Sequence, residues 1–267
     1  MKPEIINRDM WRFGAICLAL FALLGVTSAH AGGVGVNGLD PFELQVYDGE
    51  VLDAGVPMLE LHAVSYANAF GAPNTGFDPG LMHLTLEPQV GLGKGFELGG
   101  YFETGYWPQG GYQVEGAKLR AKAKFSPDSW PVQVAVNVEV GRGDPMTGEA
   151  VWGAEIRPIV SGHFGPVRAA FNPIVDMDFM PAGPVTFQPA AKVNCEVGWG
   201  IAPGIEYYTD LGPILSLLPV VQETHLLMVT LDVYRWKNIE INLGAGIPLT
   251  QVTGGFVGNA NLGVVLP

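Results

Sequence analysis

Residues Val132–Val140 read VQVAVNVEV, and this stretch decides the fold class. Valine occupies every second position, while Gln, Ala, Asn and Glu fill the positions between. Alternation with a period of two is typical of a β-strand whose two faces meet different surroundings. The pattern returns in Ala117–Phe125 and Ile239–Leu243, whereas the 3.6-residue period of an amphipathic helix is hard to find. The chain is therefore expected to be all-β.

Twelve such segments follow the N-terminal part of the chain. We predict strands at residues 57–67, 81–90, 96–106, 116–125, 131–141, 152–161, 167–179, 187–197, 203–210, 223–233, 239–249 and 256–266. Tight turns alternate with longer connections rich in Gly and Pro, at residues 68–80, 107–115, 142–151 and 211–222. Strands of about ten residues joined in this way indicate a single transmembrane antiparallel β-barrel, with short periplasmic turns and longer extracellular loops.

The distribution of charge supports a membrane location. Apart from Glu223 at the first position of the segment 223–233, one face of each predicted strand lacks Asp, Glu, Lys and Arg, and a charge at the bilayer midplane costs about 2–4 kcal/mol. Aromatic residues such as Phe96, Trp130 and Trp199 lie near strand ends, where the membrane interface favours them. A soluble β-sandwich would place its charges outward. Hydrophobic residues make up 48% of the chain and charged residues only 15%, which is too apolar for that class.

Two features conflict with an ideal barrel. Pro88, Pro158, Pro173, Pro189 and Pro248 fall within predicted strands, although proline has no N–H to donate to a neighbouring strand. The chain also ends in Leu-Pro rather than in an aromatic residue. The sequence alone does not explain how the strands that contain proline stay paired.

The N-terminal residues 1–31 are predicted to be a cleaved signal peptide. An apolar run from Phe13 to Val26 has the length of a signal core and is too short to span a bilayer. Ala29-His30-Ala31 fits the small-residue cleavage pattern, and an uncleaved anchor is the alternative. The expected location is the outer membrane of a Gram-negative bacterium. Cys195 is the only cysteine after this segment, so no internal disulfide is expected.

Residues 32–56 precede the first predicted strand and form a separate segment, while residues 57–267 form the barrel. Phe42–Tyr47 has the alternation of a short strand, and an acidic stretch follows it. Three interpretations stay open for this segment: a plug inside the barrel, a periplasmic extension or an unstructured lead-in.

The second face of the strands collects nearly all of their charge and is expected to line the lumen. The predicted lumen residues are Glu60, His62, Glu87, Glu97, Glu103, Lys118, Arg120, Lys122, Lys124, Glu139, Glu155, Arg157, Arg168, Asp176, Asp178, Lys192, Glu196, Glu206, Asp232 and Glu240. Lys118, Arg120, Lys122 and Lys124 place four positive charges on one face of one strand. These charges either form a constriction that filters solutes or pair with one another in a closed lumen. The excess of acids would favour cations in an open pore.

Other function classes find little support. The formal net charge is −12, so the basic surface of a nucleic-acid-binding protein is missing. The motifs HExxH, CxxC and GxSxG do not occur. His62 and Ser65 lie on opposite faces of their strand, so they do not form a nucleophile and base pair. We expect no enzyme activity, no cofactor and no metal.

Several segments carry a family resemblance. They are DPFELQVYDGE at 40–50, LTLEPQVGLGKGFELGGYFET at 84–104, GAKLRAKAKF at 116–125, WGAEIRPIV at 152–160, FNPIVDMDF at 171–179 and GIEYYTDLGPI at 204–214. Together they resemble proteobacterial outer-membrane β-barrel proteins of unknown function. That group is distantly similar to the outer-membrane channel family associated with phenol meta-cleavage pathways. The resemblance implies a transmembrane barrel with prolines at matching positions, but it identifies no substrate and no functional residue.

The sequence therefore predicts a passive outer-membrane channel for small solutes, with selectivity set by a charged lumen. A non-conducting structural or surface-binding barrel is the alternative, and a barrel-embedded lipid hydrolase is the third choice. The expected partners are outer-membrane lipid, an unidentified small solute, and the barrel-assembly machinery and periplasmic chaperones during transit.

Overall fold

The computed structural model describes residue 39 and residues 44–67, 82–107, 111–143, 151–179, 183–250 and 255–266. All regular secondary structure in these ranges is β-strand. None of the described residues belongs to a helix that is long and apolar enough to cross a membrane. The predicted signal peptide at residues 1–31 lies outside the described residues.

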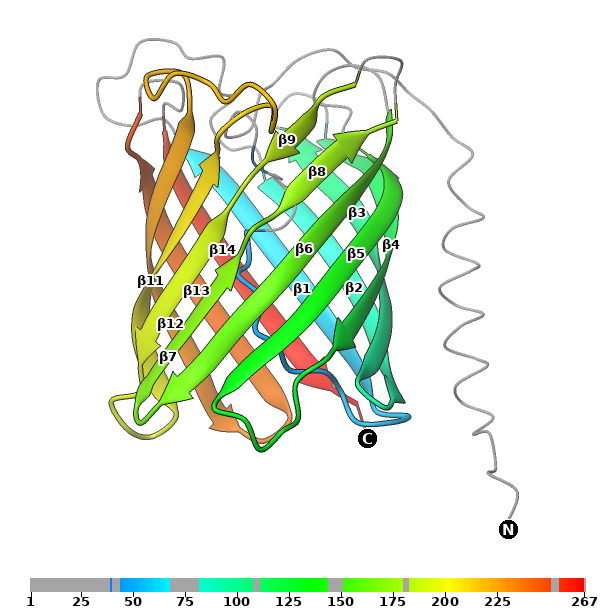
Figure 1. Ribbon diagram of the computed structural model, residues 1–267, viewed down its shortest axis with the longest axis vertical. Helices are drawn as coiled ribbons and strands as arrows, with labels where there is room; N and C mark the ends of the chain where they lie inside the picture. The colour runs from blue at the N-terminus through cyan, green and yellow to red at the C-terminus, as the bar shows by residue number, and fades with distance from the viewer. Residues whose placement is uncertain are drawn as a thin grey trace.

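The strand segments form one sheet that closes on itself. Their bounds are β1 (Pro57–Ala67), β2 (Met82–Gly93), β3 (Phe96–Trp107), β4 (Gly111–Lys124), β5 (Val132–Gly143), β6 (Val151–Phe164), β7 (Val167–Asn172), β8 (Val175–Asp178), β9 (Val185–Phe187), β10 (Ala190–Cys195), β11 (Ile201–Asp210), β12 (Thr224–Trp236), β13 (Ile239–Pro248) and β14 (Phe256–Val265). Neighbouring strands of the sheet pair antiparallel, and β1 pairs with β14 (Figure 1). Closure leaves no open sheet edge, which a hydrocarbon environment demands.

Two strands of the barrel wall are each divided into two segments. β6 pairs with β7 up to Val160 opposite Phe171, and it pairs with β8 from Ile156 opposite Val175, in the same register. β9 and β10 together form the next wall strand in the same way. The fourteen segments therefore form twelve wall strands, and the predicted twelve-stranded barrel is confirmed.

These divisions occur where three prolines face one another. The register places Pro158 opposite Pro173, and it places Pro173 opposite Pro189 on the following strand. Because proline has no N–H, the pairing of β6 lapses at this position and resumes beyond it. The Gln188 amide still donates to the Ile174 carbonyl at 2.9 Å. Pro158 and Pro173 thus share one interruption, whereas Pro189 faces β11, where its carbonyl accepts from the Thr209 amide at 3.1 Å. These three residues are called the proline seam.

The other two strand prolines are accommodated separately. Pro88 stays opposite Leu59 of β1. Its missing donor falls in a gap of the β2–β3 pairing, which lapses after Leu86 and resumes at Gln89. Pro248 is the last residue of β13, where pairing ends in any case.

One predicted connection is wrong. Residues 107–115 were expected to form a long loop, but β3 extends to Trp107 and β4 already begins at Gly111. The pairing of Tyr106 with Tyr112, whose ring centroids lie 5.6 Å apart, continues the sheet there. Glycine and aromatic residues look like a loop in the sequence, but cross-strand pairing extends the strand.

The two faces of the wall differ as lipid and lumen require. Large apolar side chains such as Leu119, Ile156, Val229 and Leu243 are exposed on the outside. The inside contains most of the buried polar side chains and also an apolar cluster. This cluster lies toward the end of the barrel that carries the long loops, whereas buried charges occur in both halves.

Candidate functional site

The chain enters the barrel wall only after it has run through the lumen. Residues 44–56, called the inner segment here, lie within the barrel and lead into β1 (Figure 1). Leu44 and Tyr47 are only 1% and 6% exposed. Residues 44–48 have no strand pairing, so the short strand predicted at Phe42–Tyr47 is not found in the described part of that range.

Side chains of the wall satisfy the backbone of the inner segment. Asn172 accepts a hydrogen bond from the Tyr47 amide at 2.7 Å and donates one to the Tyr47 carbonyl at 2.9 Å. The Ser161 hydroxyl accepts from the Gly49 amide at 2.8 Å. Asn259 donates to the Leu44 carbonyl at 3.0 Å. Buried backbone groups need such partners, so these contacts fix the path of the segment.

The inner segment presents a different face to each side of the lumen. Leu44 and Val46 pack into the apolar cluster with residues of the wall such as Leu226 and Met228. Tyr47 faces cations instead. The centroid of its ring lies 4.4 Å from the Arg157 guanidinium, 5.3 Å from the Lys122 ammonium and 5.6 Å from the Arg120 guanidinium. Alternate side chains of an extended segment point in opposite directions, which accounts for the division.

Arg120 is the centre of a buried charge network. Its guanidinium donates to Glu87, to Gln89 at 2.5 Å and to Glu97 at 2.6 Å. Glu87 also contacts the His62 ring nitrogen Nε2 at 2.9 Å. A side chain at Gly99 would place its Cβ 3.0 Å from Arg120 Nε, so glycine leaves room for the guanidinium. Multiple partners offset the cost of burying these charges.

The other lumen bases also have carboxylate partners, with one exception. The pairs are Lys118 with Glu103 and Glu139, Lys124 with Glu50 and Asp128, Arg157 with Glu155, Arg168 with Glu196, and Lys192 with Glu206 and Asp232. Lys122 is 7% exposed and makes no ion pair or hydrogen bond with any described residue. The row of four bases predicted in β4 is thus three paired cations and one that contacts only an aromatic ring.

The remaining predicted lumen residues lie nearer the ends of the barrel or beside the network. Glu60 lies close to the network, because Gln89 donates to it at 2.8 Å. Asp176 is half-buried and Asp178 is exposed, both toward the long loops. Glu196 is exposed just beyond β10, and Glu240 is exposed near the start of β13.

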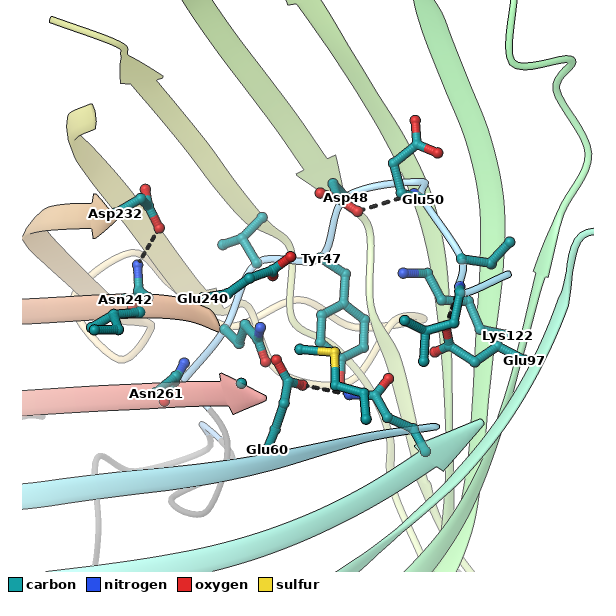
Figure 2. Close-up of a pocket in the computed structure, with 18 of the residues that line it drawn as sticks. Tyr47, Asp48, Glu50, Glu60, Glu97, Lys122, Asp232, Glu240, Asn242 and Asn261 are labelled. Atoms are coloured by element: carbon teal, nitrogen blue, oxygen red, sulfur yellow. Dashed lines mark hydrogen bonds between the residues drawn. The ribbon is translucent and has the colours of Figure 1, made fainter. Parts of the chain in front are cut away.

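A crevice remains beside the inner segment, in the half of the lumen that carries the short turns. It has a volume of about 270 Å³ and is lined by the inner segment and by residues of β1–β4, β10 and β12–β14 (Figure 2). Its lining includes Asp48, Lys122, Asp232, Glu240, Asn242 and Asn261. A cavity of this size with polar walls has room for on the order of ten water molecules.

Sequence reasoning missed several residues of this site. The prediction of lumen residues rests on charged residues within predicted strands. It therefore omits Tyr47 and Asp48, which lie outside those strands, and the uncharged Asn172 and Asn261. Asn172 and Asn261 occupy inward positions, so the alternation of polar residues along their strands was the available signal.

Possible metal ligands and possible serine nucleophiles of the lumen already have other partners. Ligand atoms of Glu60, His62 and Glu87 lie within 4.8 Å of one another. The Glu87 carboxylate already binds the Arg120 guanidinium, which competes with a metal cation. Ser161 accepts from the backbone of the inner segment, and the Ser65 hydroxyl donates to the Gly258 carbonyl at 3.4 Å. Among the described residues, no serine hydroxyl contacts a histidine.

Comparison with known proteins supports the fold. The COG4313 outer membrane channel from Pseudomonas putida F1 is 15% identical with a TM-score of 0.56, and the match covers 84% of this chain and 100% of that one. The KdgM porin is 10% identical with a TM-score of 0.53, covering 79% of this chain and 99% of that one. The same porin in complex with disordered oligogalacturonate gives 11% identity and a TM-score of 0.52. No family model and no curated protein matches the chain. The chain is an outer-membrane-type β-barrel.

Proposed function

We propose that this protein is a passive outer-membrane channel for small solutes. Its charged lumen would set selectivity, and the inner segment would narrow the pathway. We further propose that residues 1–31 are a cleaved signal peptide, and that chaperones and the barrel-assembly machinery receive the exported chain. Two of the similar barrels are named as a channel and a porin, which supports this choice.

The observation that carries the proposal is the polar crevice beside the inner segment. A barrel with a purely structural role needs no such space, because charges and apolar side chains can fill the lumen. Here a space of about 270 Å³ remains between the inner segment and the wall, including its strands β12–β14. Charged side chains line this space, as is typical of a selective pathway.

Single-channel recording in a planar bilayer tests the proposal. The refolded protein is first shown to be a barrel by heat-modifiable migration on a gel. We expect small, discrete, salt-dependent steps from the protein with its inner segment in place. Deleting residues 32–56 should produce larger steps, because the inner segment, which hydrogen bonds to Asn172, Ser161 and Asn259 of the wall, then no longer occupies the lumen.

A matched deletion of residues 32–38 retains Leu39 and the inner segment, so it should leave the step size of the intact protein unchanged. A folded protein that is silent both with and without residues 32–56 contradicts the channel. Equal steps in all three forms would mean that the inner segment does not restrict flow.

The second candidate is a closed barrel that conducts nothing. The packing of Leu44 and Val46 against the apolar cluster favours it, because this contact fills the lumen toward the long loops. Both candidates predict low conductance with the inner segment present. They differ in the intact protein, because the channel gives small discrete steps whereas a closed structural barrel gives none and gains a pore only through the deletion. The third candidate, a lipid hydrolase, requires a substitution at one serine or histidine to abolish lipid hydrolysis.

A further inference from the structure

Lys122 differs from the other lumen bases because it forms no ion pair with a described carboxylate; Glu97 stands opposite it on β3 but binds Arg120 instead. Its side chain projects from β4 into the crevice, and the residue is 7% exposed. Its Nζ atom lies over the ring of Tyr47, 5.3 Å from the ring centroid. A buried cation without a counter-charge is costly, so an anionic partner is expected at this position.

Asn261 is a second side chain that lacks a partner in the same crevice. It lies on β14, is 4% exposed, and neither its amide nitrogen nor its amide oxygen has a hydrogen-bond partner among the described residues. Buried amides are almost always hydrogen-bonded, and leaving one unpaired costs free energy. An unpaired amide beside an unpaired ammonium therefore points to a polar ligand.

Two carboxylates complete the set. Asp48 of the inner segment and Glu240 of β13 line the crevice, are exposed to it, and form no ion pair with described residues. Glu240 lies within electrostatic range of both Asp48 and Lys122. Figure 2 shows Lys122 and Glu240 on opposite sides of Tyr47. Among the described residues that line the crevice, one cation and two anions thus have no ion pair, and Asp48 accepts a hydrogen bond only from the Glu50 amide, at 3.0 Å.

We propose that this crevice binds small α-amino acids, and basic amino acids most tightly. The solute carboxylate would pair with the Lys122 ammonium, and the solute cations would pair with Glu240 and Asp48, while Asn261 donates and accepts hydrogen bonds. A simple anion meets Lys122 but is repelled by two carboxylates. A simple cation satisfies the carboxylates but leaves Lys122 without a partner. Amino acids would then also be the solutes that the proposed channel carries, and this part rests on the proposed function.

The test measures binding directly, by isothermal titration calorimetry of the full-length mature protein in detergent. L-Lysine carries one carboxylate and two ammonium groups. Cadaverine is the same molecule without the carboxylate, and glutarate has carboxylates without an ammonium. We expect L-lysine to bind about tenfold or more tightly than either analogue, because each analogue leaves unpaired charge in the crevice. Equal affinity for all three molecules would overturn the proposal.

Substitutions then assign the charges. Lys122→Met should weaken L-lysine binding about tenfold or more without weakening cadaverine binding, because cadaverine has no carboxylate for Lys122 to pair with, whereas Glu240→Gln should weaken both. Lys122→Arg retains the charge and should retain most of the affinity. Lys237→Met removes an exposed lysine in the β12–β13 turn and should change nothing. Unchanged L-lysine affinity in Lys122→Met, or equal loss in Lys237→Met, contradicts the site.

A further variant guards against misfolding of Lys122→Met. Asn261→Ala removes an amide that bonds to no described residue, so the barrel should fold normally while L-lysine binding weakens. Calorimetry needs no conduction, which separates the two proposals. Binding by a protein that shows no channel steps would overturn the channel alone, and channel steps without amino-acid binding would overturn the amino-acid site alone.

Discussion

Tyr47 shows how one residue organises the interior of the barrel. Its ring lies against the side chains of Arg157, Lys122 and Arg120, and its hydroxyl contacts the Tyr101 hydroxyl at 2.5 Å. Cations over an aromatic face are stabilised by about 0.5–2 kcal/mol each, depending on how far they are desolvated. Tyr47 therefore holds the inner segment against the basic side of the lumen, and the crevice beside it is lined by two of these bases, Arg120 and Lys122.

The Asn172 amide is predicted to control the mobility of this residue. Asn172→Ala removes both hydrogen bonds to the Tyr47 backbone, and leaving buried groups unpaired costs about 1–3 kcal/mol. Hydrogen–deuterium exchange of a peptide covering residues 44–53 should accelerate accordingly. Asn194→Ala is the matched control, because Asn194 is equally buried but bonds to Asp232 instead. Unchanged exchange in Asn172→Ala would show that other anchors suffice.

At this scale the sequence predicts which strand residues face the lumen, because side chains alternate strictly along a strand. It does not predict which charges pair. Arg120 and Lys122 occupy equivalent positions on β4, yet Arg120 reaches Glu87 and Glu97 while Lys122 meets Tyr47. Those partners come from other strands and from the inner segment, so their positions depend on the closed barrel.

At the scale of the strand, the proline seam accounts for a feature that the sequence left unexplained. Alternation along each strand was enough to place the strands, since β1 and β13 match the predicted ranges closely. The alternation carries no information on pairing across strands, so it could not show that Pro158 faces Pro173. The same limitation explains the loop wrongly expected at residues 107–115.

Restoring one donor in the seam should stabilise the barrel. Pro173→Ala returns an N–H opposite Pro158, and a net gain of about 1 kcal/mol is expected for the new hydrogen bond. Greater freedom of the unfolded chain offsets up to about 1 kcal/mol of this gain in water, but an unpaired group in hydrocarbon costs more. Urea unfolding in lipid vesicles, followed by tryptophan fluorescence, should show a higher midpoint.

Pro127→Ala is the matched control for this substitution. Pro127 lies in the exposed turn between β4 and β5, where no strand pairing lapses. Its replacement should leave the midpoint unchanged or lower it slightly. A lower midpoint in Pro173→Ala than in the unaltered protein would mean that proline is required in the seam for its backbone shape.

At the scale of the whole molecule, closure between β1 and β14 can be tested by cross-linking. Ala63 of β1 stands opposite Ala260 of β14, and opposite residues in adjacent strands have Cβ atoms about 4.5–5.5 Å apart, close enough for a disulfide after small shifts. In a Cys195→Ser background, Ala63→Cys with Ala260→Cys should cross-link on oxidation. The oxidised protein should then migrate as a compact barrel even after boiling, until it is reduced.

Ala63→Cys with Ala245→Cys provides the comparison. Ala245 lies on β13 and pairs with Gly258, so it is two strands away from β1. Two strand spacings are about 10 Å, beyond the reach of a disulfide. Cross-linking in this control, or none in the Ala63 and Ala260 pair, would be inconsistent with the closed sheet.

The attachment of the inner segment to the wall has a kinetic consequence. Its last residues join β1 directly at the rim of the short-turn end, and the Gly55 amide is held there by the Gly91 carbonyl at 2.8 Å. A segment that leaves its contacts stays tethered within a few residues of them, so it returns as an intramolecular ligand at an effective concentration of about millimolar or higher. A free peptide of the same sequence would compete poorly at micromolar concentration. The lifetime of an unblocked barrel is then governed by how fast its own tethered chain rebinds.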